Sequence, residues 1–186
     1  FGSNAEMSSN MTIAYMNGFQ GDVIDNKSVL TMVKHFPGGG PQENGLDPHL
    51  YSGRNQTYPG DNFDYHLIPF KKAVKNNLKV IMPYYGIPVG QTDENVAIAF
   101  NKYILTDLLR KELGFDGVIC SDWGIITGRH WGVGDLSIEA RYKKSIEHLL
   151  NRTTGDGVLA VIFFTLTAVG DARKEGGDVR HGVLLC

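Results

Sequence analysis

The feature that most constrains the fold is a series of short, almost wholly apolar runs, each separated from the next by a longer segment with helical periodicity. The runs occupy residues 30–35, 80–84, 117–121 and 158–165. Apolar residues recur at helical spacing in residues 5–19, 65–76, 95–113 and 136–150. Strands that are apolar on both faces and alternate with helices are typical of a parallel sheet covered by helices. The sequence therefore predicts an α/β fold of alternating parallel strands and helices.

Two architectures fit this alternation, a doubly wound sheet and a (β/α)8 TIM-type barrel, and periodicity alone does not separate them. Polar or aromatic pairs follow three successive runs: Lys34-His35, Tyr84-Tyr85 and Asp122-Trp123. In barrels, the carboxyl ends of several strands carry the chemistry. No glycine pattern for dinucleotide phosphates opens a helix after any of these runs, which disfavours the doubly wound alternative. A complete barrel needs about 250 residues, so a chain of 186 residues with three or four strands predicts a partial barrel.

Composition and charge exclude several classes of function. Hydrophobic residues make up 42% of the chain and charged residues 20%, as in globular domains. The formal net charge is −2, so nothing indicates a nucleic-acid partner. The longest apolar stretch, residues 158–169, contains two threonines and is better explained as core than as a membrane span. The histidines are scattered without metal-ligand spacing, and we expect neither a metal nor another cofactor.

The stretch VKHFPGGG, residues 33–40, marks where regular structure ends beside a candidate binding pair. Pro37 lacks a backbone donor, and the three glycines that follow allow sharp turns. Lys34 and His35 supply several hydrogen-bond donors, which suit hydroxyl groups or a carboxylate. The alternative is an exposed lysine beside a packed histidine. The long loop that follows, residues 37–62, is of a length that is usually functional or disordered.

A carboxylate follows the run ICS in the motif ICSDWG, residues 119–124. Asp122 in a pocket at a strand end could be a nucleophile, a base, a metal ligand or a sugar-binding group. The neighbouring Trp123 is suited to stack on the face of a sugar. The alternative is that Asp122 caps a turn and that Trp123 and the Tyr84-Tyr85 pair serve only in packing.

Taken together, these motifs resemble the glycoside hydrolase family 3 β-glucosidases. The matching series, in order along the chain, is KHFPGG, YPG, HLIPFKKA, IMPYYG and GFDGVICSDW, preceded by FGSNAEMSSNMTIAYMNGFQG. The resemblance covers residues 1 to about 146. It implies that residues 1–150 are part of the family's N-terminal barrel domain and that the chain acts on β-linked oligosaccharides or glycosides. Residues 151–186 do not resemble the family, and we expect a divergent tail there.

The resemblance also implies roles for individual residues. The aspartate of SDW is the family's catalytic nucleophile, which falls on Asp122. In the family the Lys-His pair binds sugar hydroxyls, and this role falls on Lys34 and His35. The tyrosine near the nucleophile matches Tyr85 better than Tyr84. Trp123 would line the same sugar site. Retaining glycosidases use two carboxyl groups roughly 5–5.5 Å apart, and a cation such as Lys34 would favour the ionised nucleophile.

The sequence departs from the family pattern at two parts of the family's site, the upstream sugar-binding residues and the acid/base. The upstream Asp and Arg that bind the sugar in the family have no counterpart, because the chain begins at FGS. The family's usual acid/base is a Glu of a second domain that lies beyond this chain, so we expect little turnover from the chain alone. The compartment stays open, although members of the family are often secreted or periplasmic.

Two alternatives remain open at this point. The β-N-acetylglucosaminidase branch of the family has KHFPGHG followed by Asp-Ser-His, whose His-Asp pair is its acid/base. Here Gly39 replaces the second histidine of that pattern, and Asp47-Pro48-His49 arrives two residues late. Pro48 restricts Asp47 to extended conformations. The second alternative is a non-catalytic sugar-binding or inactive fragment that uses the same pocket.

Overall fold

The computed structural model of the chain describes residues 2–150 and 160–161. The elements of the main sheet and its helices are α1 (Ala5–Gln20), β1 (Met32–Phe36), α2 (Phe63–Lys75), β3 (Val80–Pro83), η4 (Tyr103–Glu112), β5 (Val118–Cys120), α3 (Ile138–Leu150) and β6 (Ala160–Val161). Shorter elements lie in the connections: η1 (Glu43–Gly45), η2 (Tyr51–Gly53), β2 (Asn55–Gln56), β4 (Ile87–Pro88) and η3 (Ile98–Phe100).

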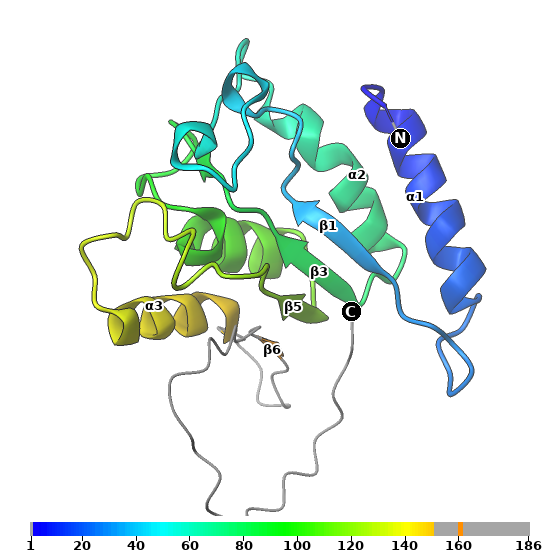
Figure 1. Cartoon of the computed structure of the whole chain (residues 1–186). Coiled ribbons are helices and arrows are strands. Elements are labelled where there is room, and N and C mark those ends of the chain that lie inside the picture. Colours follow the sequence, from blue (N-terminus) through cyan, green and yellow to red (C-terminus); the bar gives the residue numbers. More distant parts are fainter. Residues whose placement is uncertain (1, 151–159, 162–186) are drawn as a thin grey trace, which may run out of the picture.

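Four of the described strands form a parallel sheet whose order, β1-β3-β5-β6, follows the chain (Figure 1). Its register places Ile81 of β3 opposite Val33 of β1 and Ile119 of β5. The α/β fold of alternating parallel strands and helices is therefore confirmed. Of the predicted strand at residues 158–165, Ala160–Val161 pairs with β5, and the rest lies outside the described residues.

The two faces of the sheet are covered differently. Phe36, Ile81 and Ile119 belong to the main core, which they share with side chains of α1, α2 and η4. The alternate positions, Val80 and Cys120 among them, form a separate small cluster on the other face. Among the described residues, these three helices thus pack on one face, as in (β/α) barrels, whereas doubly wound sheets carry helices on both. The described strands form an open sheet, and the barrel itself stays a prediction.

Local sequence signals explain where the helices begin and end. The side chain of Asn4 accepts a hydrogen bond from the backbone N–H of Met7 at 2.8 Å and so caps α1. Gly21, with φ +74°, ends it. The predicted helices at residues 5–19, 65–76 and 136–150 agree with α1, α2 and α3 to within two residues at each end.

The predicted continuous helix at residues 95–113 is wrong in its first half. Residues 96–100 are buried. Val96, Ala97, Ala99 and Phe100 pack in a cluster with Tyr85, Ile125 and Val133, Ile98 belongs to the main core, and only the short turn η3 forms there. The side chain of Asn101 then accepts a hydrogen bond from the backbone N–H of Ile104 at 3.0 Å, and the π-helix η4 follows. Tertiary burial on a second cluster therefore overrides the helical spacing of this segment.

The long loop at residues 37–62 is more structured than the sequence predicts. It contains η1, η2 and the strand β2, which pairs in parallel with β4. The buried side chain of Gln56 donates a hydrogen bond to the carbonyl of Gly38 at 2.7 Å and so closes the loop on itself. None of the described helices is long and apolar enough to span a membrane.

Candidate active site

The carboxyl ends of β1, β3 and β5 lie at one edge of the sheet because these strands are parallel and adjacent (Figure 1). This brings His35, Tyr85 and Asp122 together from three separate parts of the chain. The hydrogen bond from the backbone N–H of Tyr84 to the carbonyl of Phe36, 2.8 Å long, continues the pairing of β1 and β3 up to this edge.

Asp122 is a buried carboxylate whose two oxygens have different surroundings. Its side chain is 9% exposed. Oδ1 accepts hydrogen bonds from the hydroxyl of Tyr85 at 2.9 Å and from the backbone N–H of Trp123 at 2.7 Å. Oδ2 lies 3.3 Å from Nε2 of His35. The side chain is therefore held through Oδ1, and Oδ2 has more of its acceptor capacity left for a ligand.

Tyr85 is the tyrosine that contacts the carboxylate. Its hydroxyl proton lies between two acceptors, Oδ1 of Asp122 and the carbonyl of Trp123 at 2.7 Å. Burial raises the pKa of the Tyr85 hydroxyl, and its hydrogen bond to Asp122 raises it further. Tyr85 therefore stays protonated as a donor. Tyr84 instead packs its ring against that of His35, with ring centroids 5.0 Å apart.

His35 is a half-buried imidazole that favours its neutral form. Burial lowers its pKa from the ordinary value of 6.5, the negative charge of Asp122 opposes this, and the charges of Lys34 and His49 lower it further. The Lys34–His35 peptide bond is cis. The register of β1 against β3 shifts between Lys34 and Phe36, which ends the regular alternation of the strand.

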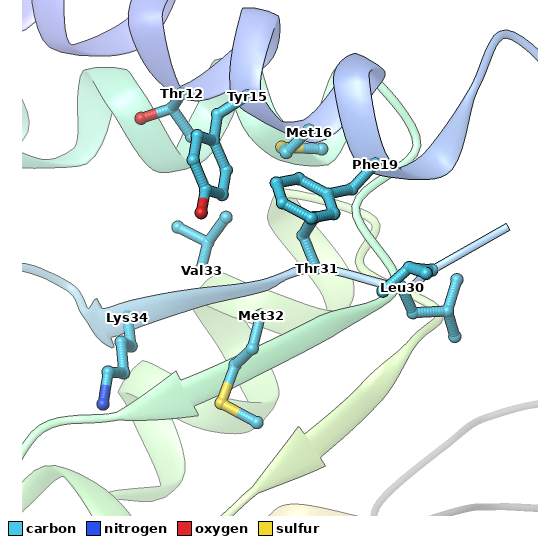
Figure 2. Close-up of a pocket in the computed structure, with 10 residues that line it drawn as sticks. Thr12, Tyr15, Met16, Phe19, Leu30, Thr31, Met32, Val33 and Lys34 are labelled. Atoms are coloured by element: carbon cyan, nitrogen blue, oxygen red, sulfur yellow. The ribbon is translucent and has the colours of Figure 1, made fainter. Parts of the chain in front are cut away.

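The structure does not join Lys34 to Asp122 by any hydrogen bond or ion pair between described residues. Lys34 is exposed. It is among the residues that line a groove beside α1 and β1, with its side chain directed away from α1 (Figure 2). Its positive charge contributes to lowering the pKa of the neighbouring His35. Trp123 is 52% exposed, and its backbone N–H and C=O both bond to site residues. The roles of Lys34, His35, Tyr85, Asp122 and Trp123 stay predictions.

The loop at residues 41–53 adds a hydrogen-bonded pair to this edge. Nδ1 of His49 lies 2.6 Å from Oδ1 of Asp47, which also accepts the backbone N–H of His49 at 2.9 Å. These hydrogen bonds lower the pKa of the Asp47 carboxyl. The ring of His49 packs against that of Tyr85, with centroids 4.8 Å apart. The sequence pointed to this pair only through the alternative branch of the family.

Arg129 is a site residue that the sequence analysis missed. Its guanidinium carbon lies 5.4 Å from the centroid of the Tyr85 ring, and Nη1 lies 3.5 Å from the carbonyl of Trp123. Its charge contributes to lowering the pKa of Asp47. Its Nε is buried and has no partner among the described residues. A lone arginine in the sequence TGRHW carries no signal that could have identified it.

Residues suited to a metal ion do not gather at this edge. In residues 2–150 and 160–161, no three or more His, Cys, Asp or Glu side chains form a group that could hold a metal ion. The arrangement instead combines a held carboxylate, a neutral imidazole, a hydroxyl donor and an exposed indole. Such a set can attack or stabilise an electron-poor carbon and can bind hydroxyl groups.

Comparison with known proteins places the chain in a family. Residues 1–142 match the sequence profile described as "Glycosyl hydrolase family 3 N terminal domain". β-Glucosidase C of Emericella nidulans is 52% identical over 148 residues, which are 74% of this chain and 24% of that protein. The periplasmic β-glucosidase/β-xylosidase of Dickeya chrysanthemi is 32% identical over 172 residues, 78% of this chain and 26% of that protein.

A solved structure agrees with this placement. The family 3 β-N-acetylglucosaminidase of Paenibacillus sp. FPU-7 superposes with a TM-score of 0.63 at 25% identity, over 87% of this chain and 28% of that one. The chain therefore belongs to glycosyl hydrolase family 3 and carries its N-terminal domain sequence. It spans about a quarter of the length of these relatives. The matched residues end within α3, at residue 142, and the predicted boundary near residue 150 stays a prediction.

Proposed function

We propose that this chain is the nucleophile-bearing part of a retaining, exo-acting β-glucosidase in carbohydrate catabolism, with Asp122 as the nucleophile. The observation that carries the proposal is the asymmetric environment of the carboxylate. Two donors hold Oδ1, while Oδ2 has His35 as its polar neighbour. The names of two relatives, β-glucosidase C and a β-glucosidase/β-xylosidase, support a β-linked glycoside as the substrate.

The proposed reaction has two displacements. In the first, Oδ2 of Asp122 forms a bond to the anomeric carbon while the bond from that carbon to the leaving oxygen breaks, and the leaving oxygen takes a proton from an acid. In the second, water attacks the same carbon, gives a proton to the conjugate base, and releases Asp122. His35 and Lys34 would bind sugar hydroxyls, and Trp123 would stack on the sugar ring. These contacts accelerate the reaction to the extent that they strengthen in the transition state.

The identity of the acid separates the leading proposal from a second candidate. In β-glucosidase-type members the acid is a Glu of a second domain. The second candidate is a β-N-acetylglucosaminidase-type mechanism in which His49, paired with Asp47, is the acid. The observation that favours it is the packing of this hydrogen-bonded pair on Tyr85. Against it, a Cβ at Gly39, where that branch has histidine, would lie 3.3 Å from the Tyr84 ring.

An activated fluoro-sugar tests the proposal without requiring the acid. A dinitrophenyl β-glucoside with fluorine at the second carbon has a leaving group that needs no protonation, and its glycosyl-enzyme hydrolyses slowly. We expect the intact mass of the chain to increase by one fluoroglucosyl group over time, and no increase with Asp122→Asn. Asp116→Asn, at an exposed position, is the matched control. Reversible binding without attachment would support a non-catalytic sugar-binding module instead.

The leaving-group dependence tests the second candidate. When the change His49→Ala is made in a full-length relative, aryl glycosides with poor leaving groups should react as in the unmodified relative if the acid lies elsewhere. A loss confined to poor leaving groups would assign the acid to His49 and favour the second candidate. Asp47→Asn should then show the same pattern to a smaller degree, because the imidazole would remain.

A further inference from the structure

A tryptophan outside the predicted site joins the loop after β5 to the loop at residues 41–53. Nε1 of Trp131 donates a hydrogen bond to the carbonyl of Pro48 at 3.0 Å, across 83 residues of sequence. The ring of Tyr51 meets the Trp131 ring edge-on, with centroids 5.9 Å apart. Pro48 is buried and lies between Asp47 and His49. Trp131 therefore holds the backbone between the two members of the hydrogen-bonded pair.

The Asp47–His49 pair is otherwise held within its own loop, where the backbone N–H of Leu50 donates a hydrogen bond to the carbonyl of Asp47 at 3.1 Å. The side chains of His49 and Asp47 are 50% and 58% exposed. Their mutual hydrogen bonds fix the imidazole relative to Asp47 but do not fix the pair relative to Asp122. Contact of the His49 ring with Tyr85 adds one further constraint. Exposed loop segments with few buried contacts open most readily, so a further contact to the backbone of this loop helps to fix the pair.

Trp131, in contrast, is tied firmly to the scaffold. Its carbonyl accepts a hydrogen bond from the backbone N–H of Ala97 at 2.9 Å. Gly132, with φ +78°, lies so close to the backbone that a Cβ would be 2.4 Å from the carbonyl oxygen of Asn95. Arg141 of α3 donates to the carbonyls of Ile126, Val133 and Gly134 at 3.2, 3.2 and 2.8 Å. The loop after β5 is thus anchored at both sides of Trp131.

We propose that Trp131 is a positioning residue that fixes the Asp47–His49 pair against Tyr85, the tyrosine bonded to Asp122, by linking the 41–53 loop to the anchored loop after β5. The proposal rests on the proposed function in one respect, that this edge is where substrate binds. It assigns Trp131 no contact with substrate. Its effect passes through the carbonyl of Pro48 to the imidazole of His49.

The test is the NMR signal of the His49 imidazole in the 186-residue chain, compared with Trp131→Phe. Phenylalanine keeps an aromatic ring but removes the N–H donor. We expect the His49 ring signals to lose the displacement caused by the Tyr85 ring and to move toward the position of an unstructured histidine. We expect the signals of His148, which lies on α3 away from this loop, to stay in place, which shows that the fold is retained. His49 signals unchanged in Trp131→Phe would overturn the proposal.

A second measurement keeps the proposal testable if Trp131→Phe does not fold. In the unmodified chain, the indole N–H of Trp131 should exchange with solvent at least tenfold more slowly than that of a free indole. Trp123→Phe, the same change at the other tryptophan, assigns the two indole signals. Exchange of Trp131 as fast as a free indole would overturn the proposal. Because neither readout depends on turnover, failure here is distinct from a failure of Asp122 to react with the fluoro-sugar.

Discussion

The side chains at the carboxyl edge of the sheet form hydrogen bonds with one another, whereas those at its β1 side are mainly apolar and partly exposed. At the carboxyl edge, Asp122, Tyr85 and the Asp47–His49 pair bond to one another and to backbone groups. At the β1 side, a groove of about 400 Å³ between α1 and β1 is lined mainly by apolar groups, drawn in Figure 2. Three of these side chains, Tyr15, Phe19 and Leu30, are 59%, 47% and 42% exposed.

The side chains that could take part in chemistry thus lie at the carboxyl edge, and the exposed apolar side chains lie at the β1 side. The carboxylate of Asp122, the hydroxyl of Tyr85 and the Asp47–His49 pair have partners within residues 34–131, whereas several apolar side chains of the groove are partly exposed. An edge strand beside exposed apolar groups favours association with other chains. We therefore expect substitutions at the carboxyl edge to change reactivity or loop structure, and substitutions at the β1 side to change solubility with little effect on the site.

The largest effect is expected from adding a methyl group to the loop of the site. In Gly53→Ala, the Cβ would lie 2.1 Å from the carbonyl oxygen of Asp47, so the backbone of the loop has to shift. We expect a loss of about 2–4 kcal/mol in the free energy of unfolding, measured by urea denaturation. Gly18→Ala in α1 meets nothing within 4 Å and should instead stabilise by up to about 1 kcal/mol. If Gly53→Ala and Gly18→Ala changed the free energy of unfolding equally, the contrast between the loop of the site and α1 would be lost.

The next effect concerns the donor that holds the carboxylate. Tyr85→Phe removes the hydroxyl that bonds to Oδ1 of Asp122. A hydrogen bond to a charged group contributes about 1.5–3 kcal/mol, so labelling of Asp122 by the fluoro-sugar should slow by roughly tenfold to a hundredfold. Tyr84→Phe, the neighbouring change, should alter the rate by less than about threefold. A larger effect at Tyr84 would reverse the assignment between the two tyrosines.

We expect partly buried histidines to make the free energy of unfolding depend on pH. The residues that line the groove include no histidine, so substitutions there should leave this dependence unchanged. Burial lowers the pKa of His35, His66, His130 and His148 below 6.5. The folded chain then binds fewer protons than the unfolded chain between each folded pKa and 6.5, so the free energy of unfolding falls as the pH decreases through that window. Above about pH 7 these groups are neutral in both states and contribute no slope.

Urea denaturation at several pH values between about 7.5 and 5 measures this slope. His35→Gln should flatten it, because glutamine does not titrate. A slope unchanged in His35→Gln would mean that burial does not disfavour protonation at this site. An increase in the free energy of unfolding as the pH falls would contradict the lowered pKa values of all four histidines.

The smallest effect on stability is expected at the β1 side. Leu30→Lys places a charge beside the edge strand and should reduce concentration-dependent light scattering, with a change in unfolding free energy within about 0.5 kcal/mol. Leu50→Lys is the matched control, because Leu50 is also exposed, at 60%, but lies on the loop of the site. Equal improvement from both substitutions would mean that the groove is not the source of association.

Much of the fold could be predicted from the sequence because it depends on local patterns. Apolar runs of strand length and the caps of α1 are readable without knowing what packs where. The start of the helix after residue 100 could not be predicted, since residues 96–100 are fixed by packing in two clusters, Ile98 in the main core and the others with Tyr85 and Ile125. Helical spacing does not distinguish a helix face from an irregular segment buried on both sides.

The site was predictable only where a motif follows a strand. Lys34, His35, Tyr85 and Asp122 stand at strand ends, which parallel pairing brings to one edge. Arg129 and Trp131 come from a loop, and their partners, Tyr85 and Pro48, are distant in sequence. Contacts between loops leave no periodicity in the sequence, so only the folded chain reveals them.

The central claim is that the Asp122 carboxylate attacks the sugar, and peptide mapping after reaction with the fluoro-glucoside tests it most directly. The peptide that contains Asp122 should carry the fluoroglucosyl group, attached through an ester that hydroxylamine cleaves. A label on any other residue, Asp47 or His49 included, or release of dinitrophenolate without any labelled peptide, would contradict the account.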